Sequence, residues 1–509
     1  MAIRALILGT LCLSVISVSP IGAVEGIASP GGVDVGIDAL RQGRFAQAGD
    51  RFALISRESP LAAEGPFFEA FLIWWRLLDR TSLEESRPLR LAMEERLAET
   101  VLRARAMADS PDPLIRQRAL TFLGTALLLD AQSKVARGAH FGAASAARQG
   151  HQALSEVLAA QPESADAMFA MGVYNYFADN MPVFVKGLRF FLLIPGGDAR
   201  LGLSQLESSA QRSRIFGTES LLLLGHIHSG NYEHDFTRAL GFVDRATARH
   251  PDSPLIALVR ADLLFRLGKL KEASATAAEV LRMVRSASGY AEDLEGLAAY
   301  RISACTLELH DPLTAVAQIE DVLKASPVGT ALTRRRLASL LVAAARESGA
   351  PERAVSPLEQ IALPTDEMES LRRRLRSSRP DPLAGPRASA LQSFSQGRAA
   401  LATREIEVLL TANPSDRRLH YDYGRMLQLQ GRHDEAQSHL EQAAEGDTQS
   451  RHADIAGWAL VRLGWAREVA GQRALALSFY RRASQLKHFT FQAAALDLLD
   501  HPALSQPEG

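Results

Sequence analysis

Aromatic and arginine side chains recur at helical spacing in the last quarter of this 509-residue chain. Tyr421 and Arg425 are four residues apart, and Trp458 and Trp465 are seven apart, so each pair shares one face of a helix. Both residue types are typical anchors of protein interfaces. Their pattern therefore predicts binding, and the opposing interpretation is that the tryptophans are core residues under a capping helix.

Histidine and cysteine are placed less favourably for chemistry. His226, His228 and His234 lie close together, but His226 and His228 point to different helix faces, which favours solvated turn histidines over a metal site. Cys305 lies in the small and apolar stretch 302–307, which indicates a buried hydrophobe rather than a nucleophile. We therefore expect no metal, no cofactor and no catalytic residue.

The sequence also lacks the short motifs that position reacting groups. It has no nucleophile elbow, phosphate loop, dinucleotide fingerprint, paired-cysteine metal spacing or zinc-protease motif. Its net charge of −1 gives no overall field that would attract nucleic acid. We expect a non-enzymatic protein without a nucleic-acid partner.

A recurring pattern organises the chain into elements that would position these residues. A large residue stands four positions after a small one, and an apolar residue stands three positions after the large one. In several copies a proline follows five positions after the apolar residue. The spacing places these residues on one helical face, and the proline ends the helix. Two steps between copies are 34 residues, 273 − 239 and 436 − 402, the period of a helix-turn-helix solenoid. The copies begin at Ala48, Gly150, Ala239, Ala273, Ala315, Ala402, Ala436 and Ala476.

A large residue followed by glycine marks the helix before the pattern, as in Leu224-Gly225, Tyr423-Gly424 and Leu463-Gly464. With the glycine turn and small residue that follow, these marks resemble the tetratricopeptide repeat, most strongly over about 219–283 and 389–483. The resemblance implies an all-α solenoid of helical hairpins wound as a right-handed superhelix. It also implies that the first helix of each hairpin lines the concave side.

The resemblance further implies a binding role for the C-terminal repeats. The partner-binding candidates on the concave side are Arg418, Tyr421, Arg425, Trp458, Trp465 and Glu468, together with Gln428 and Val461. Chaperone-binding members need lysine and asparagine at these positions, so Tyr421 and Arg425 do not imply that activity. We expect a scaffold that holds a protein segment in its groove. The alternative is a small-molecule or glycan-binding protein, which a closed, aromatic-lined pocket would favour.

Composition divides the chain into further segments. The spacing from Ala354 to Ala402 is 48 residues, 402 − 354, and prolines interrupt this stretch, so a linker with a short charged helix separates two arrays. An apolar insertion contains residues 183–194, which either fill the solenoid's own groove or contact a partner or a membrane surface. The expected segments are a signal peptide 1–23, a flexible leader 24–34, an N-terminal array 35–363 with the insertion at 180–197, a linker 364–388, a C-terminal array with a capping helix 389–503, and a disordered tail 504–509.

The N-terminus has the three parts of a secretory signal. Arg4 supplies a positive charge, residues 5–18 are apolar, and Ala23 offers a cleavage site. A retained membrane anchor is the alternative, although the run is short for a span and no other segment approaches the length needed. Abundant arginine and alanine suggest a bacterial source. These features favour a soluble protein exported to the periplasm, where it serves as an adaptor of the cell envelope.

Cleavage of the signal gives the first testable prediction. The mature protein is expected to begin near Val24 and to be recovered in the periplasmic fraction, because the segment before it has the parts that signal peptidase recognises. N-terminal sequencing of the native protein checks this. Recovery of a chain that retains residues 1–23 would contradict it.

Overall fold

The computed structural model describes residues 30–78, 83–180, 195–230, 233–325, 329–376, 381–445, 453–487, 489–503 and 505–508. Within these ranges all regular elements are helical, which confirms the all-α prediction. The expected signal peptide, and residues 181–194 of the expected insertion, lie outside the described residues.

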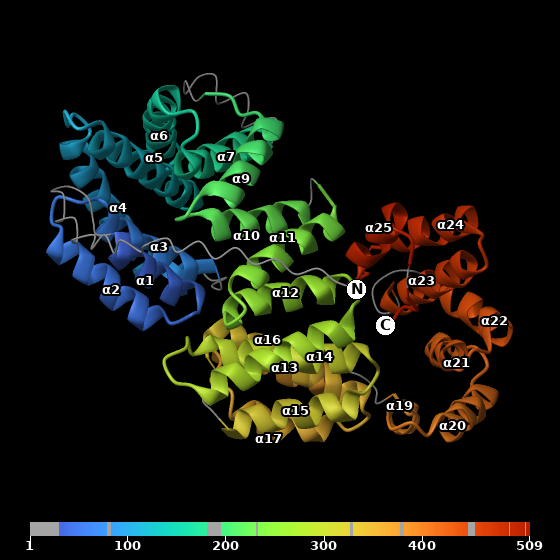
Figure 1. Ribbon diagram of the computed structural model, residues 1–509. Helices are drawn as coiled ribbons and strands as arrows, with labels where there is room; N and C mark the ends of the chain where they lie inside the picture. The colour runs from blue at the N-terminus through green and yellow to red at the C-terminus, as the bar shows by residue number, and fades with distance from the viewer. Residues whose placement is uncertain are drawn as a thin grey trace, which may run out of the picture.

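Helices follow one another as antiparallel hairpins and form two arrays (Figure 1). The N-terminal array contains α1 Pro30–Arg41, α2 Phe45–Glu58, α3 Glu64–Leu78, α4 Leu83–Met107, α5 Pro113–Ala136, α6 His140–Ala160, α7 Ala165–Asp179, α9 Ala199–Arg212, α10 Gly217–His228, α11 Phe236–Arg249, α12 Pro254–Arg266, α13 Leu270–Ser286, α14 Asp293–Glu308, α15 Pro312–Ala325, α16 Ala331–Glu347, η1 Pro351–Ala354, α17 Val355–Glu359 and α18 Thr365–Arg376. The C-terminal array contains α19 Ala384–Ser395, α20 Ala399–Ala412, α21 Arg417–Leu429, α22 His433–Ala444, α23 Ala453–Val469, α24 Arg473–Ser484 and α25 Gln492–Asp500.

The recurring sequence pattern forms the core of the hairpins. Its small residues are buried in every copy, and the large residues that follow them, such as Phe52, Leu154 and Tyr480, are 0% exposed. Glycine on the facing helix allows the close approach. A Cβ atom on Gly150 of α6 would lie 2.9 Å from the carbonyl oxygen of Gly124 in α5. The helices of a pair are therefore in contact through their backbones, and the small residue is a steric requirement.

Tight turns between paired helices require a left-handed backbone. Glycine occupies this position in several turns, with φ near +75° at Gly43, Gly268 and Gly431. His310, between α14 and α15, adopts φ 66°, which is costly for a residue with a side chain. Tertiary contacts described below hold this histidine in place.

The N-terminal array curves until its first hairpin meets its later helices. Arg41 of α1 donates to both carboxylate oxygens of Glu219 in α10, at 3.0 and 2.8 Å, and both side chains are buried. Ser253, the N-cap of α12, donates its hydroxyl to the carbonyl oxygen of Arg41 at 2.5 Å. The Ala291 amide bonds to the carbonyl of Gly43 at 2.8 Å. These contacts close the first turn of the superhelix.

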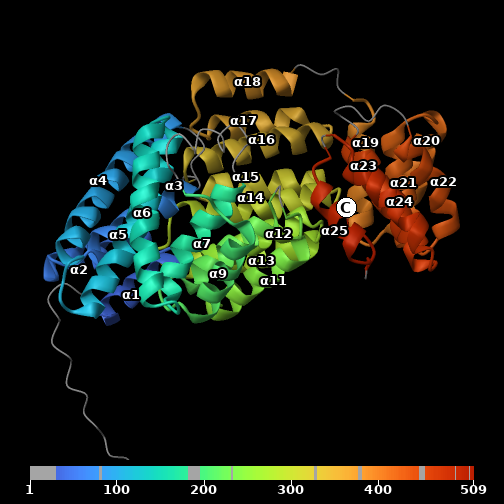
Figure 2. The ribbon, with the colours of Figure 1, turned by 90° about the horizontal axis from the view of Figure 1, so that it is seen from above.

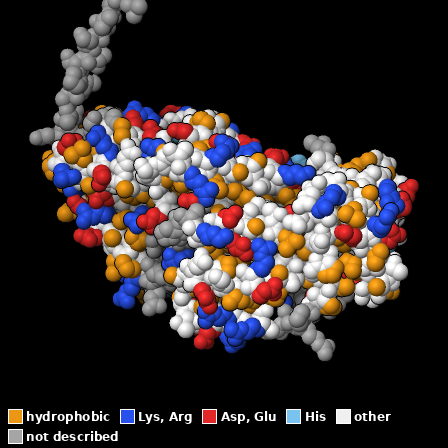
Figure 3. All heavy atoms as spheres, turned by 90° about the horizontal axis from the view of Figure 1, so that it is seen from below, with side chains coloured by type: hydrophobic (Ala, Val, Ile, Leu, Met, Phe, Trp, Pro, Cys, Tyr) orange, Lys and Arg blue, Asp and Glu red, His pale blue; other side chains and the backbone are white. Residues whose placement is uncertain are grey.

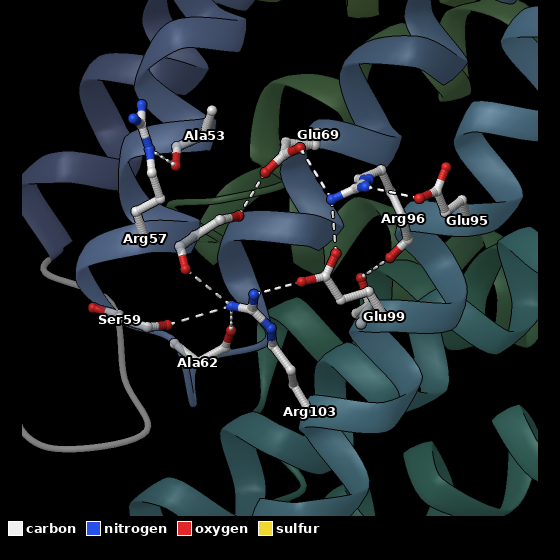
Figure 4. A network of polar contacts seen from close by, with 11 residues as sticks. Ala53, Arg57, Ser59, Ala62, Glu69, Glu95, Arg96, Glu99 and Arg103 are labelled. Atoms are coloured by element: carbon white, nitrogen blue, oxygen red, sulfur yellow. Dashed lines mark hydrogen bonds and ion pairs between the residues drawn. The ribbon is translucent and has the colours of Figure 1, made fainter.

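A network of arginine and glutamate side chains fixes α4 against the hairpin α2–α3 (Figure 4). Arg103 of α4 donates to the carbonyl oxygens of Ala62 and Ser59, at 3.3 and 3.5 Å, and pairs with Glu99. Arg96 lies between Glu99, at 2.7 Å, and Glu69 of α3, at 3.7 Å. The end of α2 is thus anchored by side chains of α4, where the sequence showed few repeat marks.

Two expected boundaries differ from the structure. Residues 30–34, assigned to a flexible leader, belong to α1, because Val33 and Ile37 form a buried apolar face and Gly32 accepts a hydrogen bond from Arg51 at 3.1 Å. The expected linker 364–388 contains α18, where the sequence predicted a short charged helix, and α18 lies along the edge of the N-terminal array beside α16 (Figure 2). The difference is at its end, since α19 begins at Ala384 and the C-terminal array was expected from residue 389. Leu371 buries α18 at this edge, whereas Arg372, Arg373 and Arg374 are exposed.

Surface charges of both signs are mixed. Acidic and basic side chains alternate with apolar patches across the face seen in Figure 3. This arrangement agrees with the near-zero net charge of the sequence. No helix in the described part of the chain is both long and apolar enough to cross a bilayer.

Substitution of one interhelical glycine tests the packing. Gly150→Ala is expected to destabilise the protein by roughly 1–3 kcal/mol, because its new methyl group would press on the backbone of Gly124. The matched control is Gly241→Ala in α11, where a Cβ meets nothing within 4 Å and the residue is exposed. This control is expected to stabilise by roughly 0.5–1 kcal/mol through helix propensity. Urea denaturation measures both, and equal effects of the two substitutions would contradict the close-approach explanation.

Candidate functional site on the inner face of the C-terminal array

Helix α21 turns a row of polar side chains toward the interior of the protein. Tyr421, Arg425 and Gln428 follow one another at spacings of four and three, and they are 1%, 7% and 2% exposed. The N-cap residue Asp416 accepts hydrogen bonds from the amides of Arg418 and Leu419, both at 2.9 Å, which fixes the start of the helix. We call these α21 side chains, with Arg462 of α23, the inner face.

Arg462 is the centre of the inner face and is 0% exposed. Its Nε donates to the Tyr421 hydroxyl at 3.2 Å, and its Nη1 donates to Gln428 Oε1 at 2.9 Å. Gln428 Nε2 in turn donates to the carbonyl oxygen of Arg462 at 3.2 Å. A buried guanidinium requires such bonds because its desolvation is expensive. Arg462 was not among the residues predicted from the sequence, although it lies four residues after Trp458 and therefore on the same helix face.

The end of the chain lies against the inner face, and Figure 1 shows the C-terminus inside the arc of α19–α25. Arg462 Nη2 donates to the carbonyl oxygen of Pro507 at 2.9 Å, and Arg425 Nη2 to that of Glu508 at 3.4 Å. The expectation of a disordered tail at 504–509 is therefore corrected for residues 505–508. Their polar composition suggested disorder, but buried arginines of α21 and α23 bind their main chain.

The N-terminal array covers much of the remaining inner face. Arg418 pairs with Glu347 of α16 at 2.5 Å, and Arg425 Nη2 lies 3.5 Å from the carbonyl oxygen of Leu309. The ring of His310 lies 5.5 Å from that of Tyr421, and its Nδ1 is 3.8 Å from the Asp422 carboxylate. Predicted partner-facing residues Arg418, Tyr421 and Arg425 thus contact the chain's own α14–α16 region.

The structure separates the two tryptophans that the sequence placed on one binding surface. Trp458 is 4% exposed and lies between Phe489, Phe491 and the turn at Gly268, so it is a core residue that joins the two arrays. Trp465 is partly buried, with its ring 5.7 Å from that of His433.

Glu468 and Val461 are also engaged within the protein. Glu468 Oε1 pairs with Arg473 at 2.5 Å, while its Oε2 accepts hydrogen bonds from the Tyr480 hydroxyl at 2.9 Å and the Ala503 amide at 3.0 Å. Val461 is buried in the core. Glu468 therefore fixes the start of the tail that leads to the inner face.

The positive charge of Arg425 is buried without a carboxylate partner among the described residues. Desolvation, and then the positive charge of Arg462, lower the pKa of Arg425 to about 10. Its Nε has no hydrogen-bond partner among the described residues, and none of their carboxylates forms a salt bridge with it. Desolvation also raises the pKa of Asp422, despite the opposing charge of Arg387 at 3.8 Å. A negatively charged group that accepts hydrogen bonds from Arg425 would therefore bind strongly at this position.

A second candidate site lies between α4, α5 and α6. A cavity of about 400 Å³ is lined by polar residues, including Glu94, Arg105, Asp130 and Gln149, above an aliphatic wall. Arg105 already bonds to Gln149 at 2.7 Å. The lining contains no aromatic residue, so the cavity lacks the feature that would favour a glycan site.

The other residues considered from the sequence are the histidines at the end of α10 and Cys305 in α14. Burial lowers the pKa of His226 and His228, and the His228 ring stacks on Phe242 at 5.4 Å. The described residues contain no group of three metal-binding side chains. Cys305 is buried, and desolvation raises its pKa to about 12, which opposes thiolate chemistry.

Comparison with known proteins identifies the repeats. A family model of the tetratricopeptide repeat matches residues 416–487, which span α21 to α24. This match confirms the resemblance to the tetratricopeptide repeat for the C-terminal repeats, and similar close helix packing recurs in other described hairpins, as at Gly124 and Gly150. No curated protein matches its sequence.

Several solved structures are distantly similar. They include a tetratricopeptide repeat protein from Parabacteroides merdae, with 14% identity, coverage of 55% of this chain and 98% of the other, and a TM-score of 0.24. The human IFIT1 dimer with PPP-AAAA has 13% identity, coverage of 91% and 96%, and a TM-score of 0.29. Yeast Tom70 has 10% identity, coverage of 87% and 86%, and a TM-score of 0.31.

A pH-dependent stability follows from Glu308, at the end of α14. Burial, and then the charges of Asp454 and Glu347, raise its pKa from 4.5 to about 8. The folded protein therefore retains a proton that the unfolded chain releases above about pH 4.5, so stability falls as pH rises toward 8. Glu308→Gln is expected to unfold at a higher urea concentration than the unmodified protein at pH 8, and at a similar concentration at pH 4.

Urea midpoints measured across this pH range test the assignment to Glu308. The control is Glu156→Gln, which removes a carboxylate from the exposed surface of α6. A stability difference for Glu308→Gln that does not grow between pH 4.5 and 8 would contradict the raised pKa.

Proposed function

We propose that the protein is a non-enzymatic scaffold that binds an extended segment of a partner protein on the inner face of its C-terminal array. Tetratricopeptide repeats support a role in protein–protein interaction in general. The observation that carries the finer proposal is the position of residues 505–508, in which the main-chain carbonyls of Pro507 and Glu508 accept hydrogen bonds from Arg462 and Arg425. Recognition of main-chain carbonyls suits any extended segment of similar shape.

The inner face has the properties of a binding site for such a segment. Arg462 is held in position by Tyr421 and Gln428, so its Nη2 is directed toward a ligand before the ligand arrives. A preorganised donor loses little conformational entropy on binding. Arg425 adds a second guanidinium that is buried and lacks a carboxylate partner among the described residues.

Export supplies the proposed cellular setting. Arg4, the apolar run 5–18 and Ala23 favour a periplasmic protein of a bacterial cell envelope. The partner would then be another exported or membrane-attached protein. The cavity between α4 and α6 supports a small-molecule ligand as the second candidate, since its volume of about 400 Å³ is in the range of ligand pockets.

A peptide-binding assay tests the proposed function. A variant lacking residues 505–509 is expected to bind a fluorescein-labelled peptide of sequence 501–509, because the peptide restores the bonds to Arg462 and Arg425. Fluorescence anisotropy measures the Kd. In the same background, Arg425→Met is expected to weaken binding by roughly tenfold or more, as removal of a buried anchor does.

Two further variants keep this assay interpretable. Arg425→Lys retains the positive charge but loses the planar fork, so it is expected to bind with intermediate affinity. Arg404→Met removes an exposed arginine of α20 and is expected to leave the Kd unchanged. Absence of binding to the truncated variant, when circular dichroism shows that it is folded, would refute a segment-binding inner face.

A further inference from the structure

We propose that residues 505–508 are an internal ligand that closes the inner face, and that a partner binds by replacing them with an extended acidic segment of its own. This inference rests on the proposed function and adds the chemistry of the partner and the regulation of the site. It follows from the contacts of the tail, from the groups that the tail leaves unsatisfied, and from the way it joins the two arrays.

The tail contacts both arrays at once. Its main-chain carbonyls at Pro507 and Glu508 face Arg462 and Arg425 of the C-terminal array. The Glu508 side chain reaches the N-terminal array, where its Oε2 accepts a hydrogen bond from the Lys271 amide at 2.7 Å. The seated tail is therefore a connection between the arrays as well as an occupant of the inner face.

Glu508 caps the N-terminus of helix α13, where no neighbouring side chain does so. Helix α13 begins after Lys269, whose side chain makes no capping hydrogen bond. The Glu508 carboxylate supplies an acceptor to the first turn instead, where the positive end of the helix dipole favours negative charge. A partner segment that takes this place needs a carboxylate at the position of Glu508.

The tail is an imperfect ligand for the inner face. The bond from Arg425 to the Glu508 carbonyl is long, at 3.4 Å. Buried donors at Arg425 Nε and Gln506 Nε2 have no acceptor among the described residues. A segment that presents a second carboxylate to Arg425 would satisfy the guanidinium with charge-assisted bonds, which are stronger than those to a carbonyl. The better ligand is therefore an acidic segment, and it would displace the tail.

Tethering explains how an imperfect ligand can keep the site closed. The Ala503 amide is bonded to Glu468 at 3.0 Å, so the tail begins a few residues from the inner face. A segment held on such a short connection competes at an effective concentration of about millimolar order. A free partner must overcome this competition, so its apparent affinity for the full chain is reduced.

Comparison of the full chain with the variant lacking residues 505–509 tests the closed state. The probe is the labelled peptide of sequence 501–509, and anisotropy gives its Kd for each protein. We expect the full chain to bind the probe at least roughly 100-fold more weakly than the truncated variant, because the tethered tail occupies the site.

Glu508→Lys in the full chain is expected to bind the probe with intermediate affinity, since it loses the contact with α13. Pro502→Ala, at an exposed position before the closing residues, is the matched control and is expected to bind as the full chain does.

A second set of probes tests the acidity of the partner. The probe with Glu508 replaced by Gln is expected to bind the truncated variant more weakly. The probe with Gln506 replaced by Glu is expected to bind more tightly, because it adds a carboxylate to the segment that lies against Arg462 and Arg425. Equal affinities of these peptides would overturn the acidic-segment assignment.

The outcomes separate this inference from the function on which it rests. Equal affinity of the full chain and the truncated variant for the unmodified probe would overturn the internal ligand while leaving a segment-binding inner face. Failure of both proteins to bind, with the truncated variant folded by circular dichroism, would overturn the proposed function and the inference together.

Discussion

The fully buried guanidinium of Arg462 is the interaction on which the arrangement of the C-terminal array depends. Arg462 cannot remain inside the protein unless its hydrogen-bond donors are satisfied, and Tyr421, Gln428 and the carbonyl of Pro507 supply acceptors from α21 and from the tail. Helices α21 and α23 are therefore held in one relative position by a polar contact as well as by their apolar core. The same requirement draws the end of the chain inward.

The docking of the arrays depends on this arrangement. Once α21 is fixed, Arg418 reaches Glu347 and Tyr421 meets the ring of His310 at the corner between α14 and α15. His310, whose φ angle is unfavourable, lies against this corner, with its ring 5.5 Å from that of Tyr421 and its Nδ1 3.8 Å from the Asp422 carboxylate. Trp458 completes the interface by packing on Gly268, where a side chain in place of glycine would collide with the indole.

Local sequence spacing predicted the hairpins because their core is made of residues three and four apart. The alternation of Ala436, Leu440 and Ala443 on one helix with Gly424 on the other is visible in the sequence and buried in the structure. Spacing could not show that the inner face of the C-terminal array meets α14–α16, because these segments are far apart in the chain and their contacts do not follow the repeat period. Tyr421, Arg425 and Trp458 were predicted from their types to face a partner, but all three contact the N-terminal array of the same chain. The tail was misjudged because residues 505–508 have few apolar side chains and bind through their main chain.

The ion pair between Arg41 and Glu219 gives the N-terminal array a property that open solenoids lack. Repeat proteins ordinarily gain or lose hairpins at their ends, because each hairpin contacts only its neighbours. Here α1 is bound laterally to α10 and to the start of α12, so the first hairpin serves as a neighbour to helices that come much later in the chain. A hairpin added or deleted between α2 and α10 would move these partners out of register. The number of repeats in this turn is consequently fixed by closure, as the number of strands is fixed in a barrel.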